Sequence, residues 1–245
     1  MSDQTPDVRI PQLADEARRI REIYKERKEP GGPLDLYGLL ALQERQECLL
    51  LFLRDIGLTS LRDLKILDIG CGSGSMLRRF FDFGAQPGNC FGIDLLDKSL
   101  RGARQLNPNI AFVEGTAAQL PFRDGQFDLV HQSTVFTSVL NDGIRCAIAA
   151  EIMRTLRPGG CFVWYDFAYS NPRNPNVRGI GKAEIRKLFN GCGFRFHRVT
   201  LAPPIGRVAV HVSPYLYRAL SLMPLLRTHY LCLVQKLGVP VTDQN

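Results

Sequence analysis

The sequence lacks the features that mark several classes of protein. Its 245 residues include seven cysteines, but these are scattered, form no Cys-x-x-Cys pair and have no histidines at metal-ligand spacing. Neither a metal site nor a disulfide framework is therefore expected. No uninterrupted apolar stretch reaches the length of a membrane-spanning helix. The N-terminus begins with acidic and polar residues and has no apolar h-region, which predicts a cytoplasmic protein.

Charged residues are spread along the chain. The chain carries 31 Lys and Arg against 24 Asp and Glu, a formal net charge of +7, yet no long block of one sign occurs. We interpret this excess as a solvated basic surface and not as the footprint of a nucleic acid. The hydrophobic content of 45% is ordinary for a globular protein, and the length suits one α/β domain with an added cap.

Apolar periodicity predicts the order of the elements. Helical spacing over 12–28 and 34–56, interrupted by the breaker at 29–33, predicts an N-terminal helical cap within residues 1–62. In residues 63–245, segments with the apolar spacing of strands then alternate with segments that have the spacing of helices. The expected strands are 64–69, 90–94, 110–114, 127–132, 160–167, 193–201 and a closing strand at 230–234, and the expected helices are 74–83, 97–106, 143–156 and 182–190. Such alternation predicts a parallel sheet with helices on both faces.

The most informative segment is Lys65-Ile-Leu-Asp-Ile-Gly-Cys-Gly-Ser-Gly74. A buried-strand pattern ends in three closely spaced glycines, which predicts a strand, a tight turn and the N-terminus of a helix where backbone amides approach a ligand. The third glycine of the dinucleotide fingerprint is absent, because Ser75 stands at its position. Asp68 precedes the turn, where a carboxylate would repel a pyrophosphate but could hold an ammonium group.

This segment resembles motif I of the class I S-adenosylmethionine-dependent methyltransferases. Further matches follow in the same order: Phe91-Gly-Ile-Asp94, Glu114 to Phe122, Gln126 to Val130, and Leu156-Arg-Pro-Gly-Gly. The resemblance covers roughly residues 63–201. It implies a Rossmann-like, doubly wound sheet of seven strands with the last strand antiparallel, and it implies S-adenosyl-L-methionine as cofactor and S-adenosyl-L-homocysteine as product.

The resemblance also implies roles for individual residues. Asp68 and Gly70 are expected at the methionine ammonium, with the amides of Cys71, Gly72 and Gly74 near its carboxylate. Asp94 is expected to hold the ribose hydroxyls, and Leu95 to pack on the adenine. The remaining cofactor contacts are expected from Thr116, Ala117, Gln132 and Ser133. N-terminal helices often close over the cofactor in this family, which makes Tyr24 and Arg27 candidates for such a contact.

Catalytic candidates must lie beyond the fourth and fifth strands or in the late insertion. Asp166, Tyr169 and His211 qualify by position. Asp166 ends a strongly apolar strand, where partial burial would raise its pKa and make it a better general base. The alternative is that it only caps a loop, and His211 could equally be a packed or solvent-facing residue.

The insertion at about 203–227 is the least expected segment. Its apolar residues exceed one helical stripe, and Pro224 rules out one long straight helix. We interpret it as a substrate lid that could also touch a membrane surface, with Arg218 and Arg227 favouring anionic headgroups. A helix docked on the sheet and a dimer contact are the alternatives. The sequence does not assign an oligomeric state.

The leading hypothesis is a methyltransferase acting on a small molecule, on a hydroxyl of a sugar, lipid-linked glycan or secondary metabolite. A nucleic-acid methyltransferase acting on tRNA or rRNA is disfavoured, because His131-Gln-Ser-Thr134 lacks the Asn/Asp-Pro-Pro-aromatic motif of enzymes that methylate exocyclic base nitrogens. A regulatory protein that binds S-adenosylmethionine without turnover is the rival from another class. Asp68 and Asp94 make binding plausible and do not exclude that rival.

Overall fold

The computed structural model describes residues 10–25 and 34–237. A sheet of seven strands runs through the centre, in the order β3-β2-β1-β4-β5-β7-β6. The strands are β1 Ile66–Ile69, β2 Cys90–Asp94, β3 Ala111–Glu114, β4 Phe127–Ser133, β5 Leu156–Phe167, β6 Gly193–Leu201 and β7 Arg227–Gln235. Neighbouring pairs are parallel except those of β7, which is antiparallel to both β5 and β6. The predicted sheet is confirmed.

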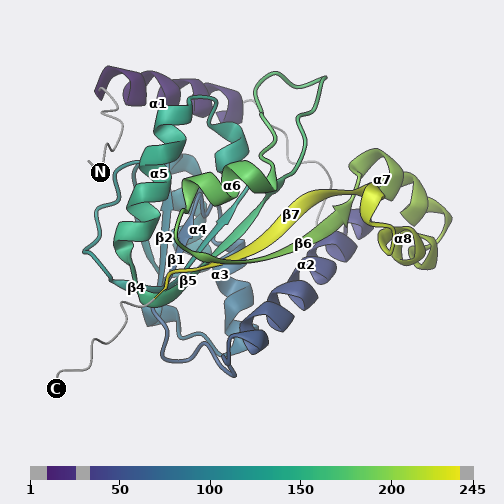
Figure 1. The fold of residues 1–245 in the computed structure, drawn as a ribbon, viewed down its shortest axis with the longest axis horizontal. Helices are drawn as coiled ribbons and strands as arrows, with labels where there is room; N and C mark the ends of the chain where they lie inside the picture. Colours follow the sequence, from purple (N-terminus) through teal and green to yellow (C-terminus); the bar gives the residue numbers. More distant parts are fainter. Residues whose placement is uncertain (1–9, 26–33, 238–245) are drawn as a thin grey trace.

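Helices cover both faces of this sheet (Figure 1). They are α1 Ile10–Lys25, α2 Leu36–Asp55, α3 Ser75–Phe80, α4 Asp97–Leu106, α5 Asp142–Thr155, α6 Lys182–Leu188, α7 Pro203–Val212 and α8 Pro214–Ser221. The helix expected at 74–83 ends at Phe80 and continues as a 3-10 turn, and the strand expected from residue 160 already begins at Leu156. The predicted breaker at 29–33 and Arg27 lie outside the described residues.

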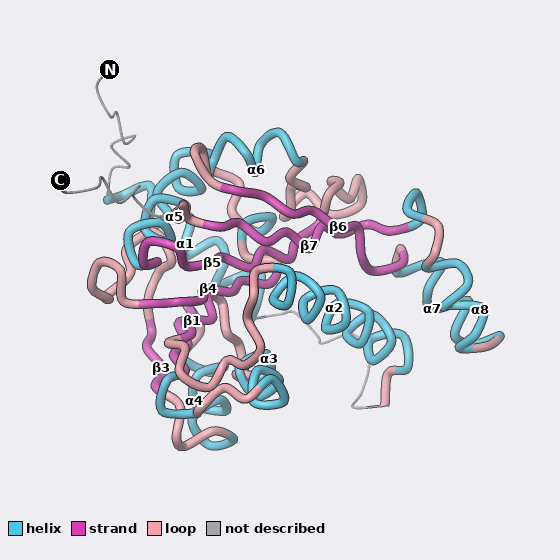
Figure 2. Tube along the Cα trace, turned by 60° about the horizontal axis from the view of Figure 1, so that its bottom comes forward, coloured by secondary structure: helices cyan, strands magenta, loops and turns pink. Residues whose placement is uncertain are grey.

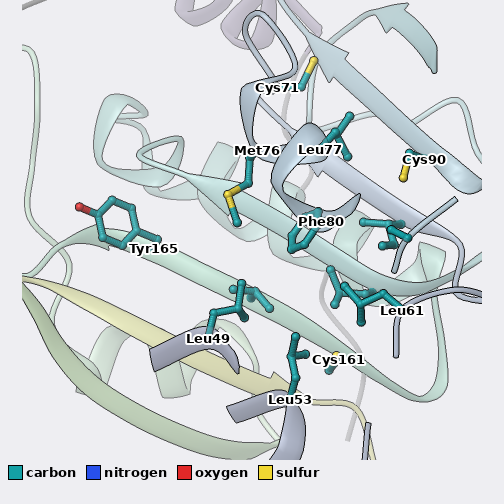
Figure 3. Packing of buried hydrophobic residues seen from close by; sticks show 14 of the residues in the cluster. Leu49, Leu53, Leu61, Cys71, Met76, Leu77, Phe80, Cys90, Cys161 and Tyr165 are labelled. Atoms are coloured by element: carbon teal, nitrogen blue, oxygen red, sulfur yellow. The ribbon is translucent and has the colours of Figure 1, made fainter. Parts of the chain in front are cut away.

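Two apolar cores lie on opposite faces of the sheet, because every second strand residue points to the same side. On one face, α2 and α3 bury Leu49, Leu53, Leu77 and Phe80 together with Val163 of β5 (Figure 3). On the other face, α5 and α6 cover a second core whose members include Ile148, Ile152, Phe162, Trp164 and Ile185.

The two helices of the predicted cap have different positions. Helix α2 belongs to the core, since Leu49 and Leu53 are almost completely buried among strand residues. Helix α1 packs only its apolar stripe, Leu13 and Ile20, against the other core. The figures show α2 beneath the sheet and α1 on the α5 side (Figures 1 and 2).

The insertion after β6 forms α7, α8 and a 3-10 turn, Pro224–Leu226. Proline at the start of each of these pieces explains why they are short, since its ring fits the first turn of a helix but not its interior. They pack on the N-terminal part of α2 through Tyr37, Leu40, Ala209 and Tyr217. This arrangement places the insertion at the outer end of the sheet, beside β6 (Figure 1).

Candidate functional site

The glycine turn after β1 is tightly packed. Gly70 has a φ of +67°, and a Cβ atom there would lie 2.5 Å from Cγ2 of Val135. Gly74 has a φ of +73°, and its Cβ would lie 2.9 Å from Cζ of Phe112. Both positions therefore require glycine for conformation and for space. The amides of Gly70 and Cys71 donate to the carbonyl of Ile93 at 2.8 and 3.1 Å, which holds the turn against the end of β2.

Asp94 at the end of β2 faces this turn. Its carboxylate accepts hydrogen bonds from the amides of Gly72, at 2.8 Å, and of Leu96, at 2.9 Å. Burial raises the pKa of Asp94, and these two bonds oppose that shift. A carboxylate has about four lone-pair sites, so two remain for a ligand's hydroxyl groups.

A cavity of about 240 Å³ opens between the turn, β2 and helix α1. It brings together seven of the predicted cofactor residues from four separate loops. These are Gly70, Gly72, Asp94, Leu95, Thr116, Ala117 and Ser133. Apolar side chains of Ile69, Ile93, Leu96, Val135 and Ile148 complete its walls. Glu16 also lines the cavity but is bonded to Arg19 and the Leu140 amide, so Asp94 is the carboxylate with accepting capacity left in a largely apolar cleft. Such a cleft suits a flat, apolar ring system that carries hydroxyl groups.

Four other predicted cofactor residues do not line this cavity. The Asp68 carboxylate is buried, and one of its oxygens accepts a hydrogen bond from Nδ1 of His131 at 2.7 Å. Gln132 is completely buried and uses its amide on the carbonyl of Tyr165 and the amide of Val135. Both residues are buried in the strands that carry the site, and neither lines the cavity.

Cys71 and Gly74 serve the packing of the turn. The Cys71 thiol lies against Gly92 and Gly72, and burial raises its pKa, which disfavours the thiolate that a nucleophile requires. The amides of Gly72 and Gly74 are already paired with the Asp94 carboxylate and the Cys71 carbonyl. These amides are therefore engaged within the protein and not presented to a carboxylate.

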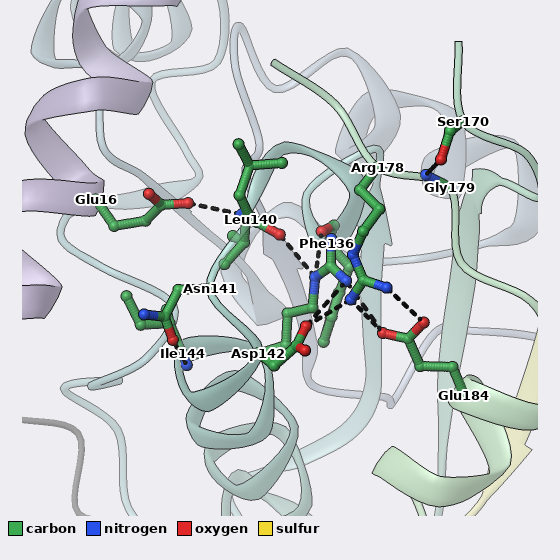
Figure 4. Close-up of polar contacts among 12 residues, drawn as sticks. Glu16, Phe136, Leu140, Asn141, Asp142, Ile144, Ser170, Arg178, Gly179 and Glu184 are labelled. Carbon is green, nitrogen blue, oxygen red and sulfur yellow. Dashed lines mark hydrogen bonds and ion pairs between the residues drawn. The ribbon is translucent and has the colours of Figure 1, made fainter. Parts of the chain in front are cut away.

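Helix α1 closes the cavity from above through Leu13, Glu16, Ala17, Ile20 and Tyr24. Glu16 accepts a hydrogen bond from the amide of Leu140 at 2.7 Å, a contact that Figure 4 displays. Burial opposes ionisation of Glu16, but the bonds from Arg19 and Leu140 outweigh it and lower the pKa. The Tyr24 hydroxyl lies 2.8 Å from the hydroxyl of Ser138. The helix is thus tied to the segment after β4 by polar contacts at several points.

A second cavity, of about 320 Å³, adjoins the first. The two share Ile20, Tyr24, Thr134 and Ser138. The second cavity continues along Thr137, Phe167, Tyr169, Val177 and three asparagines, Asn171, Asn174 and Asn176. None of the described residues that line it carries a charge. Of the three catalytic candidates, only Tyr169 lies here.

Thr134 stands at the junction of the two cavities in a strained conformation. Its φ is +59°, in the left-handed region that a β-branched residue rarely adopts. Its amide donates to the carbonyl of Tyr165 at 2.9 Å, and its hydroxyl donates to the carbonyl of Ser133 at 2.7 Å. Sequence reasoning missed this residue, because no local pattern marks a left-handed threonine.

Asp166 lies beneath the second cavity and not in its wall. It is completely buried, and its oxygens accept from the amides of Thr137, at 3.1 Å, and Phe167, at 3.0 Å, and from the Thr137 hydroxyl. Burial raises its pKa to about 7, against the lowering effect of these bonds. The expected rise in pKa is present, but the carboxyl lines neither cavity and instead holds Thr137, which does line the second one.

His211 is the clearest departure from expectation. It lies exposed on α7, and its Nδ1 contacts the carbonyl of Arg207 at 2.6 Å, one turn earlier in the same helix. No residue of 203–227 lines either described cavity. These linings give no support to the prediction of a lid over the acceptor, and apolar contacts with Tyr37 and Leu40 hold the insertion against α2.

Part of the chain is similar to known methyltransferases. Residues 66–160 match the model of a family described as a methyltransferase domain. An uncharacterized methyltransferase of Synechocystis is 34% identical over 102 residues, which cover 42% of this chain and 46% of that protein. A sterol 24-C-methyltransferase of Aspergillus fumigatus is 33% identical over 129 residues, or 48% and 32% of the two chains. A demethylmenaquinone methyltransferase of Beutenbergia cavernae is 32% identical over 104 residues, or 42% and 41%.

These alignments span less than half the length of each relative. Solved structures extend the likeness of the fold. An S-adenosylmethionine dependent methyltransferase from Mesorhizobium loti superposes with a TM-score of 0.57 at 19% identity, over 75% of this chain and 95% of that one. A SAM dependent methyltransferase from Aquifex aeolicus gives 0.56 at 13% identity, over 90% and 98%. At such low sequence identities, the similarity to these structures shows a shared fold and nothing further.

Proposed function

We propose that this chain, which carries a class I S-adenosylmethionine-dependent methyltransferase domain, transfers the methyl group of that cofactor to a small, uncharged, amphipathic molecule. S-adenosylmethionine supplies an electrophilic methyl group on a sulfonium ion, so the protein has mainly to align the acceptor with it. The observation that carries the proposal is the pair of adjoining cavities, one suited to the cofactor and one without charge.

The residues of the first cavity fit the cofactor. Asp94 keeps free lone pairs for the ribose hydroxyls, since its two protein bonds use only part of its accepting capacity. Leu95 and Ala117 provide apolar surface for the adenine, with Thr116 at its edge. Because Asp68 is engaged with His131, we expect the methionine end to depend more on the Gly70 backbone than on a direct contact with Asp68.

The second cavity defines the class of acceptor. Its described lining combines apolar groups, such as Ile20 and Val177, with amides and hydroxyls. Asparagine and threonine side chains can position hydroxyl or carbonyl groups, whereas the lack of described cations disfavours phosphate. A nucleic-acid substrate would bring phosphate groups to the opening of the second cavity. This argument favours the small-molecule hypothesis over tRNA or rRNA.

We further propose a hydroxyl oxygen as the methyl acceptor. The phenols of Tyr24 and Tyr169 are the only ionisable groups among the described residues that line the second cavity. An acceptor with an acidic hydroxyl, such as a phenol or an enol, would therefore suit it better than a sugar hydroxyl that needs a strong base. The second candidate is a carbon acceptor. It is favoured by the names of relatives, which include sterol and ubiquinone/menaquinone C-methyltransferases.

Transfer of labelled methyl groups tests the proposal. The purified chain is incubated with radiolabelled S-adenosylmethionine and with separate pools of lipids, polar metabolites, tRNA and protein, and the product is located by nuclear magnetic resonance. We expect the labelled methyl group to be attached to an oxygen atom of a lipid or of a polar metabolite. Label confined to tRNA or protein would contradict the acceptor class, and a methyl group on carbon would replace the oxygen assignment with the second candidate.

A matched pair of variants controls this assay. Asp94→Ala removes the ribose acceptor, whereas Asp97→Ala removes a partly exposed acid nearby that does not line the cavity. Transfer should fall sharply in the first variant and persist in the second. Binding of S-adenosylhomocysteine without label in any pool would support the rival hypothesis of a regulatory protein without turnover.

A further inference from the structure

The outer face of the α7–α8 insertion is apolar and uncovered. Four of its side chains are more than two-thirds exposed: Leu225 at 86%, Tyr215 at 79%, Leu222 at 77% and Val212 at 71%. Val208 and Met223 are also more than half exposed. On an ordinary surface such residues occur singly, so their concentration in one short segment marks a contact surface. We call this set of six residues the apolar face.

The opposite side of the insertion is firmly anchored, which fixes the direction of the apolar face. The Tyr37 hydroxyl of α2 donates to the carbonyl of Leu201 at 2.9 Å, and the rings of Tyr37 and Tyr217 meet edge to face at 6.0 Å. Gly206 sits against Tyr37 so closely that a Cβ would lie 2.3 Å from the ring. The exposed residues therefore cannot turn inward without breaking this packing. Helices α7 and α8 themselves lie beyond the end of the sheet (Figure 1).

The charges carried by the insertion itself are of one sign, and Glu44 of the neighbouring α2 is paired with Arg227 at 3.1 Å. Residues 185–237 contain no Asp or Glu, although they contain lysines and arginines throughout. Arg218 is exposed on α8 itself, and Arg207 lies on α7 with its guanidinium over the Tyr37 ring at 5.3 Å. Long basic side chains beside exposed apolar groups are typical of segments that lie in a membrane interface, with the charge at the headgroups.

We propose that the apolar face docks on the surface of an anionic lipid bilayer. The complementarity of charge favours this occupant, because a second copy of the chain would oppose one basic face to another. Convex, projecting helices also suit insertion among headgroups better than they suit a groove-filling partner. No helix in residues 10–25 and 34–237 is long and apolar enough to cross a bilayer.

A polar connection links the apolar face to the second cavity. Arg198 of β6 donates to the carbonyl of Pro224 in the insertion at 3.2 Å, and its other terminal nitrogen donates to the hydroxyl of Tyr169. Tyr169 lines the second cavity. Docking of the insertion would thus hold the side of the second cavity that contains Tyr169 near the bilayer. This step rests on the proposed function, and it specifies the acceptor as a molecule that partitions into membranes.

Cosedimentation of the full chain with vesicles tests the docking. We compare vesicles of phosphatidylcholine alone with vesicles of phosphatidylcholine and phosphatidylglycerol in equal parts. The variants are Leu222→Ser with Leu225→Ser, and Arg218→Glu, and the control is Leu106→Ser, a 64% exposed leucine on α4. We expect binding to the anionic vesicles that weakens as salt is raised. The double variant and Arg218→Glu should each lower the partition coefficient about tenfold or more, and the control should not.

Three results would overturn the proposal. These are equal binding by the control and the double variant, no binding of the unaltered chain to anionic vesicles, and a dimer that the double variant dissociates. Affinity for S-adenosylhomocysteine and methyl transfer to a detergent-dispersed acceptor should be unchanged in the double variant, which shows that it is folded. Vesicle binding without transfer to any acceptor would contradict the proposed function and leave the docking intact.

Discussion

Replacing Asp166 by Asn tests the role of the buried carboxyl through stability. Burial raises the pKa of Asp166 to about 7 in the folded protein, well above the usual range of an aspartate, despite the bonds from Thr137 and Phe167. The native state therefore keeps a proton that the unfolded chain releases as the pH passes about 4. Stability from this group should fall as the pH rises from about 4 to about 7, and should stay at the lower value above that range.

The size of the effect follows from the linkage between protons and folding. Each pH unit over which only the native state is protonated lowers the free energy of unfolding by about 1.4 kcal/mol. Between pH 5 and pH 7 the unaltered protein should lose at most about 2 to 3 kcal/mol through Asp166. Asn does not titrate, but its amide nitrogen would face one of the two backbone donors, which should destabilise the variant by about 1 to 3 kcal/mol at every pH.

Urea unfolding of both proteins at pH 5 and pH 8, at one ionic strength, measures this difference. Asp166→Asn should be less stable at pH 5, and the gap should narrow or reverse at pH 8. A gap that does not change with pH would refute the reasoning about the buried proton. The same variant separates positioning from catalysis, because the loss of a general base would lower turnover by roughly 10² to 10⁴-fold and remove the limb of the pH profile near 7. We expect neither.

The remaining predictions concern binding and turnover. Asp94→Ala should weaken S-adenosylhomocysteine binding at least about tenfold in calorimetry, since two charge-assisted bonds to the ribose are lost, and Asp97→Ala should not change it. Unchanged affinity in Asp94→Ala would contradict the ribose role. Tyr169→Phe should raise KM for the acceptor while leaving cofactor affinity unaltered, and an effect on the cofactor alone would displace it from the acceptor cavity. His211→Ala should keep turnover within about twofold, and a large loss would restore this residue to catalysis.

The sequence predicted those parts of the fold that depend on neighbouring residues. The apolar strand Ile66–Ile69 and the glycines after it fix a turn through local conformation and space, so Gly70, Gly72 and Asp94 could be placed at one edge of the sheet. A parallel sheet brings the carboxyl ends of its strands together, which put Thr116 in the same cavity. The seven strands followed from the same alternation, and the antiparallel last strand followed from the family resemblance.

Contacts between distant residues decided the rest. Asp68 and Asp166 both end or interrupt apolar strands, but whether each faces a ligand depended on His131 and Thr137, which the chain brings from elsewhere. A helical pattern predicted α1, but only the family resemblance suggested that it could close over the cofactor, through Tyr24. Its position depends on contacts with distant residues, such as the bond between Glu16 and the amide of Leu140, 124 residues away.

The insertion shows the same division. Its prolines determined short helices, since local geometry suffices for that. Its position could not be read from them, because it is set by the packing of Gly206 and Tyr217 against Tyr37. Local chemistry therefore determined which elements form, and tertiary packing decided which of their side chains reach the two cavities.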